Sequence, residues 1–169
     1  MKLPSYLDLT FLLSAIPHNV SEAEAGSVEA IHEEFKLTLL APANPGLPFK
    51  PLGYLLLVYL ANEAVRRDVR ELGGGLGKLC KSIGAPELAD KPGLVEDQLL
   101  RLGQAVVRVE VAVKKKRTRL ALFPFFSEVV VESEADGGLR WDVRLSGEFW
   151  RVLKNTAPMA IPKVEATKG

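Results

Sequence analysis

The chain has 169 residues, of which 47% are hydrophobic and 25% are charged, and its net charge is +1. These values exclude a disordered chain and a global basic bias, so any nucleic-acid surface must come from local clustering of charge. The single cysteine, Cys80, excludes an internal disulfide, and the most apolar run, residues 53–61, is far shorter than the roughly 20 residues that span a bilayer. We therefore expect a cytoplasmic protein without a membrane partner.

Residues 1–44 are expected to form an N-terminal extension of helix and strand that packs on the rest of the chain. Apolar side chains alternate between Leu7 and Leu13, which predicts a short strand or a packed arm. The run Ser21 to Glu24 fits a capping box and predicts a polar helix that ends near Phe35. Residues 35–40 alternate again, as a short strand would.

A central helix is expected after the proline-rich loop of residues 41–48. Pro51 suits a first helical position, and the run from Leu52 to Ala64 is apolar nearly all round, which is typical of a core helix. Three glycines at 73–75 are interpreted as a flexible joint before a short helix over residues 76–83, and Gly84 is a natural left-handed cap.

A third helix is expected to start at Pro92, with a buried stripe of Val95, Leu99, Leu102 and Val106. Strands are predicted over residues 106–113 and 120–126 and over 129–132 and 139–145, and Ser146 is expected to cap a last helix. Three helices followed by an antiparallel hairpin predict an α+β winged helix over residues 45–157, in which a helix-turn-helix precedes a β-hairpin wing. Residues 158–169 are expected to form a loose tail.

The predicted wing is strongly basic, although the chain as a whole is not. Five of the six residues from 114 to 119 are cationic, and phosphates would be their natural counter-charge. We expect DNA contacts from Lys114, Lys115, Lys116, Arg117 and Arg119. The alternative is a solvated turn that happens to be rich in lysine.

The third helix carries the second group of predicted DNA contacts. Gln98, Arg101 and Gln104 are expected to approach the major groove, and Lys91 at the helix start is expected to meet the DNA backbone. Leu94 and Leu100 flank the same face and are unusual for a phosphate-facing surface. The alternative is therefore a protein–protein contact, with these two leucines as a dimer interface.

Catalysis and metal binding find little support in the sequence. The stretch GGGLGK has the wrong spacing for a phosphate-binding loop, and neither His18 nor His32 has a cysteine near it. Cys80 lies on the apolar side of its helix, which favours a core position over a nucleophile. No enzyme activity, metal or cofactor is expected.

Several short motifs follow one another in order: GLPF at 46–49, EAVR at 63–66, the Leu-Gly step at 72–73, Ile83-Gly84, QLLRL at 98–102, and LSGEF at 145–149 with APMAIP downstream. Taken together they resemble the plasmid-encoded RepA replication initiators, in which a second Leu-Gly step stands in place of Ile83-Gly84. The resemblance covers roughly residues 45–162. It differs at Gly74 and Gly75, where the family usually has Ser and a bulky residue.

The resemblance implies a winged-helix domain that binds origin repeats or an operator in double-stranded DNA. It also implies a homodimer form that represses its own gene, contacts with host replication proteins, and a second winged helix expected beyond Gly169. We therefore expect a DNA-binding plasmid replication initiator. The alternatives are a dimerisation module of such an initiator and a winged-helix transcription regulator unrelated to replication.

Overall fold

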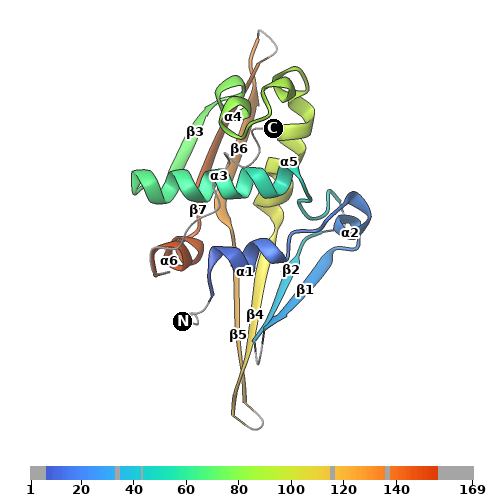
Figure 1. Cartoon of the computed structure of the whole chain (residues 1–169), viewed down its shortest axis with the longest axis vertical. Coiled ribbons are helices and arrows are strands. Elements are labelled where there is room, and N and C mark those ends of the chain that lie inside the picture. Colours follow the sequence, from blue (N-terminus) through green and yellow to red (C-terminus); the bar gives the residue numbers. More distant parts are fainter. Residues whose placement is uncertain (1–6, 33–34, 43, 115–116, 136–137, 156–169) are drawn as a thin grey trace.

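The computed structural model describes residues 7–32, 35–42, 44–114, 117–135 and 138–155. Helices and antiparallel strands alternate in it, in agreement with the predicted α+β class (Figure 1). In chain order the elements are α1 (Leu9–Ser14), α2 (Val20–Glu24), β1 (Ser27–His32), β2 (Phe35–Leu40), α3 (Leu52–Arg67), β3 (Glu71–Gly75), α4 (Leu76–Ser82), the 3-10 helix η1 (Pro86–Asp90), α5 (Pro92–Gln104), β4 (Val106–Lys114), β5 (Arg117–Pro124), β6 (Phe126–Ser133), β7 (Leu139–Leu145) and α6 (Gly147–Asn155).

The N-terminal elements differ from the prediction in two places. Residues 9–14 form a helix rather than a strand, because the Asp8 carboxylate caps it by accepting a hydrogen bond from Phe11 N at 2.8 Å. The polar helix expected to reach Phe35 ends at Glu24, and Gly26, with φ +83°, turns the chain into β1. Because β1 then pairs with β2 along its whole length, strand pairing outweighs the local helical signal there.

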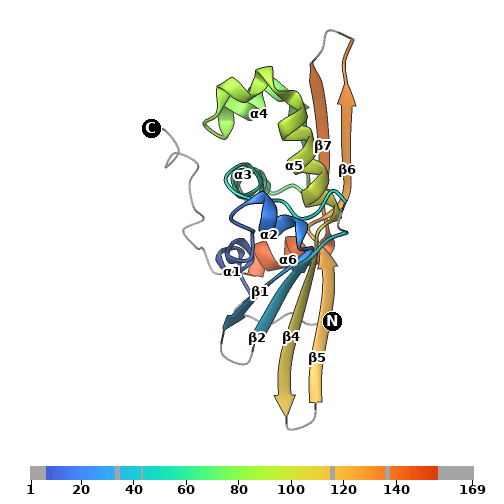
Figure 2. The same cartoon turned by 90° about the vertical axis from the view of Figure 1, so that its right-hand side faces the viewer.

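A four-stranded sheet, in the order β1-β2-β4-β5, forms one half of the described structure. Its inner face is buried and includes Leu37, Val107 and Phe123, and the helix α1 reaches it through the contact between the rings of Phe11 and Phe35, 5.0 Å apart. The helices α1 and α6 lie on this side of the sheet (Figure 2). One face of the sheet is thus buried and the other is turned outward.

A three-stranded sheet, in the order β3-β7-β6, forms the other half together with α3, α4 and α5. Residues 73–75, interpreted above as a flexible joint, are part of β3 and pair with β7. Gly73 lies so close to β7 that an added Cβ would be 2.0 Å from Asp142 Oδ1. The glycines therefore allow close strand pairing as well as the turn into α4.

The helices of this half agree with the sequence pattern. In α3, Leu56, Leu60 and Ala64 are buried at the centre of the molecule, and Gly84, with φ +79°, follows α4 as predicted. Cys80 is fully buried, and this burial raises the pKa of its thiol. None of the helices in the described part of the chain is long and apolar enough to cross a membrane.

The basic hairpin does not lie where the sequence placed it. The strands β4 and β5 belong to the four-stranded sheet, and the end of their hairpin points away from α4 and α5 (Figures 1 and 2). The hairpin beside the helices is β6–β7, which shares a sheet with β3. The expectation of a basic wing next to the third helix is therefore wrong, because β4 pairs with β2, where Val107 and Val109 complete the buried inner face.

The two sheets are joined where the chain passes from β5 to β6. Phe125 is fully buried there, and its ring centroid lies 5.2 Å from that of Phe149 in α6. Ser146 caps α6 as predicted, because its hydroxyl accepts a hydrogen bond from Phe149 N at 3.1 Å. The predicted tail, residues 158–169, lies outside the described residues.

Candidate nucleic-acid interface

The helix α5 presents one uncovered side at the end of the molecule that also carries α4 and the β6–β7 hairpin (Figure 1). Its buried side holds Val95, Leu99 and Leu102, as predicted, whereas Val106 instead begins β4. Lys91 and Gln104, two of the predicted DNA contacts, are exposed at the start and end of this helix. The uncovered side of α5 is thus the surface that the sequence analysis predicted to approach the major groove of DNA.

Gln98, a third predicted DNA contact, is instead part of the core. Only 3% of it is exposed, and its Oε1 accepts a hydrogen bond from Phe49 N at 3.0 Å. Its Nε2 donates to Asp97 Oδ2 at 3.3 Å. Because Gln98 lies three residues after Val95 and four before Leu102, its place on the buried stripe was readable from the spacing. The assignment of Gln98 to the major groove is therefore wrong.

Arg101 is also held against the protein. Its side chain is 11% exposed, its Nε lies 2.9 Å from Asp97 Oδ2, and its Nη1 donates to Leu47 O at 3.1 Å. The guanidinium carbon lies 5.0 Å from the ring centroid of Phe49, within cation–π distance. Arg101 thus fastens the loop before α3 to α5. The prediction that its side chain approaches a DNA groove is therefore wrong.

The two predicted dimer residues lie on the same uncovered side as Gln104. Leu94 is 51% exposed and Leu100 is 38% exposed. Large apolar side chains at this exposure fit a protein contact or the methyl groups of thymines in a DNA groove. Their exposure agrees with the helical spacing of the sequence. It is equally compatible with a protein contact and with a DNA contact.

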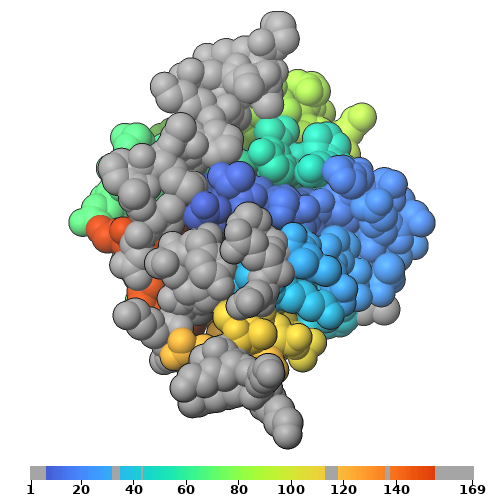
Figure 3. All heavy atoms as spheres, turned by 60° about the horizontal axis from the view of Figure 1, so that its bottom comes forward, coloured from blue at the N-terminus to red at the C-terminus, as the bar shows by residue number. Residues whose placement is uncertain are grey.

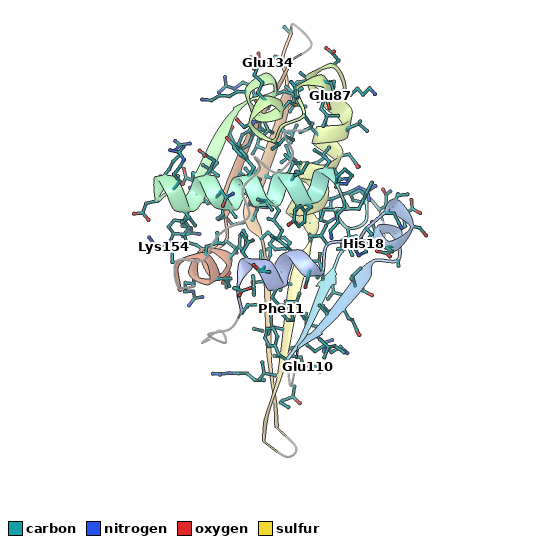
Figure 4. The ribbon with its side chains drawn as sticks, viewed as in Figure 1. Phe11, His18, Glu87, Glu110, Glu134 and Lys154 are labelled. Carbon is teal, nitrogen blue, oxygen red and sulfur yellow. The ribbon has the colours of Figure 1, made fainter. Side chains whose placement is uncertain are left out.

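The β6–β7 hairpin stands beside α5 without a basic character. Near its turn, Glu134 lies 3.9 Å from Arg140, and Glu132 is also exposed. Figure 4 places Glu134 at the same end of the molecule as Glu87 of η1. The described residues around this turn therefore carry no net positive charge that could bind DNA phosphates.

Cations gather instead in a groove of about 390 Å³ between the end of α3, β3 and the start of α4. Arg66, Arg67 and Lys78 line it, opposed by the carboxylate of Glu63. Two hydrogen bonds from Arg66, at 2.7 and 3.0 Å, hold the pKa of Glu63 below its ordinary value. The sequence interpretation missed this groove. Its local signals were the adjacent cations Arg66 and Arg67 after the apolar run and Lys78 soon after the three glycines of β3.

The basic hairpin supplies the remaining predicted contacts. Lys115 and Lys116 lie outside the described residues, and Lys114 and Arg117 end β4 and begin β5 without described side chains. Arg119 is exposed on β5, opposite Val111. Arg108 and Arg119, together with the strand ends at Lys114 and Arg117, thus belong to one hairpin, and its described strands extend away from α4 and α5.

No family model matches the chain, and no curated protein matches its sequence. Its fold is similar to two crystal structures of domains 2 and 3 of RctB. One has a TM-score of 0.62 and 9% sequence identity, and the similarity covers 94% of this chain and 63% of that chain. The other, of selenomethionine derivatives, has a TM-score of 0.61 and 9% identity, with 89% and 60% covered. At this identity the similarity shows the fold alone, and the chain spans less than two thirds of each RctB structure.

Proposed function

We propose that this chain is a DNA-binding part of a replication initiator and that it acts through a winged helix. Two independent observations support the proposal. The fold is similar to domains of RctB, a replication initiator, and the ordered motifs between residues 45 and 162 resemble plasmid RepA initiators. The proposed role is binding rather than catalysis.

The winged helix that we propose consists of α3, β3, α4, α5 and the β6–β7 hairpin. The observation that carries this assignment is the position of α5, which follows α4 after a short connection and packs beside β6 with one side uncovered. In a helix-turn-helix the second helix enters the major groove. Gln104 would then meet base edges, and Lys91 would meet the phosphate backbone.

The basic β4–β5 hairpin has a separate role in this proposal. Lys114, Lys115, Lys116, Arg117 and Arg119 would bind phosphates away from α5, either further along the same duplex or on a second one. Such contacts release condensed counterions and therefore strengthen binding to every sequence alike. Affinity and sequence preference would thus come from opposite ends of the molecule.

The proposal is tested by fluorescence anisotropy with duplexes from the DNA that flanks the gene and with scrambled duplexes, at several salt concentrations. We expect a preference of about 10³ or more for a flanking duplex, together with a steep salt dependence. Equal and weak binding to every duplex would contradict a role in origin recognition. A preferred duplex that lies in a promoter without repeated elements would favour a transcription regulator instead.

A second candidate function rests on the exposure of Leu94 and Leu100. A protein surface at α5 would make the chain a dimerisation module, or a docking site for a host replication protein. Substituting Leu94 with Asp separates this candidate from the first. Loss of self-association or of partner binding, with DNA binding unchanged, would favour the protein contact.

A further inference from the structure

The strand β3 is an edge of the three-stranded sheet. The order of the described strands is β3-β7-β6, so β7 pairs with one side of β3 and leaves the other side open. Figure 1 shows β3 at the border of the molecule, between the end of α3 and the start of α4. An open edge can pair with another strand, because its outward backbone donors and acceptors have no partner in the sheet.

The register shows which backbone groups of β3 face this open edge. Leu145 N donates to Arg70 O at 2.8 Å, one step before the register of β3 with β7 begins. Hydrogen-bonded and non-hydrogen-bonded pairs alternate along antiparallel strands. Leu72 and Gly74 are therefore bonded to β7, whereas Gly73 directs both its N–H and its C=O away from β7.

Gly75 continues this pattern two residues further along the strand. Its N–H faces outward like that of Gly73, and its carbonyl accepts a hydrogen bond from the Trp141 indole at 3.4 Å. In the described part of the chain no group outside the sheet bonds to the N–H of Gly73 or of Gly75. A Cβ added at Gly74 or Gly75 would meet no atom within 4 Å. Glycines inside a strand often mark the close approach of another backbone, and here the space for one is open.

The cationic groove between α3, β3 and α4 borders the same strand, because residues 72–75 form part of its lining. Arg66, Arg67 and Lys78 are exposed there, and Glu63 is the only carboxylate among the lining residues that the structure describes. Three cations and one carboxylate leave the groove with an excess of positive charge. Figure 3 shows the end of α3, in green, at the border of the molecule beside α6, in orange-red.

The edge and the groove together select the chemistry of an occupant. A phosphate offers only acceptors, so it could meet the cations and the N–H groups but not the outward C=O of Gly73. An extended peptide offers both donors and acceptors at the spacing of a strand. A second copy of β3 would bring two positively charged grooves together, which is unfavourable.

We propose that the open edge of β3 binds an extended acidic segment of a partner protein by strand addition. The backbone of the segment pairs with Gly73 and Gly75, and its side chains point alternately into the groove and away from it. Acidic side chains at alternate positions meet Arg67 and Lys78, for which the described residues supply no ion pair. The inference does not depend on DNA binding, so the two proposals can fail separately.

The first experiment selects peptides from a displayed library of random decapeptides on the full chain. The Gly75→Pro variant serves for counter-selection, because proline removes the outward N–H of this residue. We expect the enriched peptides to carry Asp or Glu at alternate positions. No enrichment, or enrichment of peptides without this pattern, would overturn the inference.

The second experiment tests the backbone pairing with the most enriched peptide, measured by fluorescence anisotropy. Gly75→Pro should weaken its binding at least about tenfold, whereas Gly75→Ala keeps the N–H and should change it by less than about twofold. Circular dichroism and thermal unfolding check that both variants fold. Equal affinities of the two variants would mean that the peptide does not add to the edge of β3.

The third experiment tests the charges of the groove with the same peptide. Arg67→Glu should weaken binding at least about tenfold, while Arg151→Glu on α6, an equal change of net charge, should leave it unaltered. Glu63→Gln should strengthen binding a few-fold, because it removes the carboxylate that opposes the three cations. A peptide that binds all three variants alike would rule out the groove as its site.

Two further outcomes would assign this surface to another occupant and so refute the inference. If Arg67→Glu lowers the affinity for a DNA duplex and leaves that for the peptide unchanged, the groove belongs to the DNA-binding surface. If the chain self-associates in sedimentation equilibrium and Gly75→Pro abolishes this association, a second copy occupies the edge.

Discussion

The β4–β5 and β6–β7 hairpins are built alike, from antiparallel strands joined by a short turn, but they differ in charge and in position. The first has Lys114 and Arg117 at the described ends of its strands and extends away from α4 and α5. The second stands beside α5, and Glu134 and Arg140 lie near its turn. The hairpin with the charge thus lies away from α5, and the hairpin beside α5 lacks the charge.

This difference shows that a run of cations does not by itself locate a binding surface relative to the rest of the fold. The side chains that decided the position of β4 were the valines between the cations, because they bury against the inner face of the four-stranded sheet. Sequence preference and phosphate affinity therefore need not come from adjacent surfaces. The proposed function assigns phosphate affinity to the β4–β5 hairpin and sequence preference to α5, and the variants below test this assignment.

The largest effect is expected at the basic hairpin. Substitution of Lys114, Lys115, Lys116 and Arg117 together by Gln should weaken binding to every duplex by about 100-fold or more. It should also lower the slope of log K against log salt by about 3 to 4, since each lost phosphate contact removes about 0.9. Anisotropy titrations at several salt concentrations measure both. The control variant neutralises a cation elsewhere, Arg151 on α6. An unchanged salt slope in the fourfold variant would exclude the β4–β5 hairpin from DNA binding.

The next effect concerns the stability of the α5 end. Gln98→Ala leaves the amide of Phe49 without its buried acceptor, so we expect the free energy of unfolding to fall by about 2 to 3 kcal/mol. Urea denaturation measures it. Gln104→Ala is the control, because an exposed glutamine should change stability by less than about 0.5 kcal/mol. Equal stabilities of the two variants would contradict the buried role of Gln98.

A smaller effect is expected for sequence preference. Gln104→Ala should lower the preference for the specific duplex over a scrambled one by about 1 to 2 kcal/mol, because a base contact is lost, while the salt slope stays the same. Competition anisotropy with the two duplexes measures this preference. If Gln104→Ala instead weakens both duplexes equally, α5 does not read the sequence.

The smallest effect is expected at the turn of the β6–β7 hairpin. Glu134→Lys replaces a negative by a positive charge, and if this hairpin flanks the DNA, the affinity should rise a few-fold and the salt slope should increase by about 1. The control is Glu24→Lys in α2, which changes the net charge equally at an exposed position elsewhere. Equal gains in both variants would mean that only net charge matters and that β6–β7 is not a wing.

Local sequence determined those elements that are specified by residues within or directly beside the element itself. The apolar run of α3, the proline at the start of α5, the left-handed Gly84 and the cap at Ser146 each act on the backbone beside them, and all four agree with the structure. The exposure of Leu94, Leu100 and Gln104 also followed from helical spacing. These features depend on backbone conformation and on which side of one helix is apolar.

Tertiary structure decided the partners of those elements. The alternation of β4 shows that it is a strand but not that β2, some 70 residues earlier in the chain, is its neighbour. Gln98 and Arg101 looked like DNA contacts until the loop before α3 supplied partners 49 and 54 residues away. Buried polar side chains and strand pairs depend on groups distant in the sequence, because only the folded chain brings them within hydrogen-bonding distance.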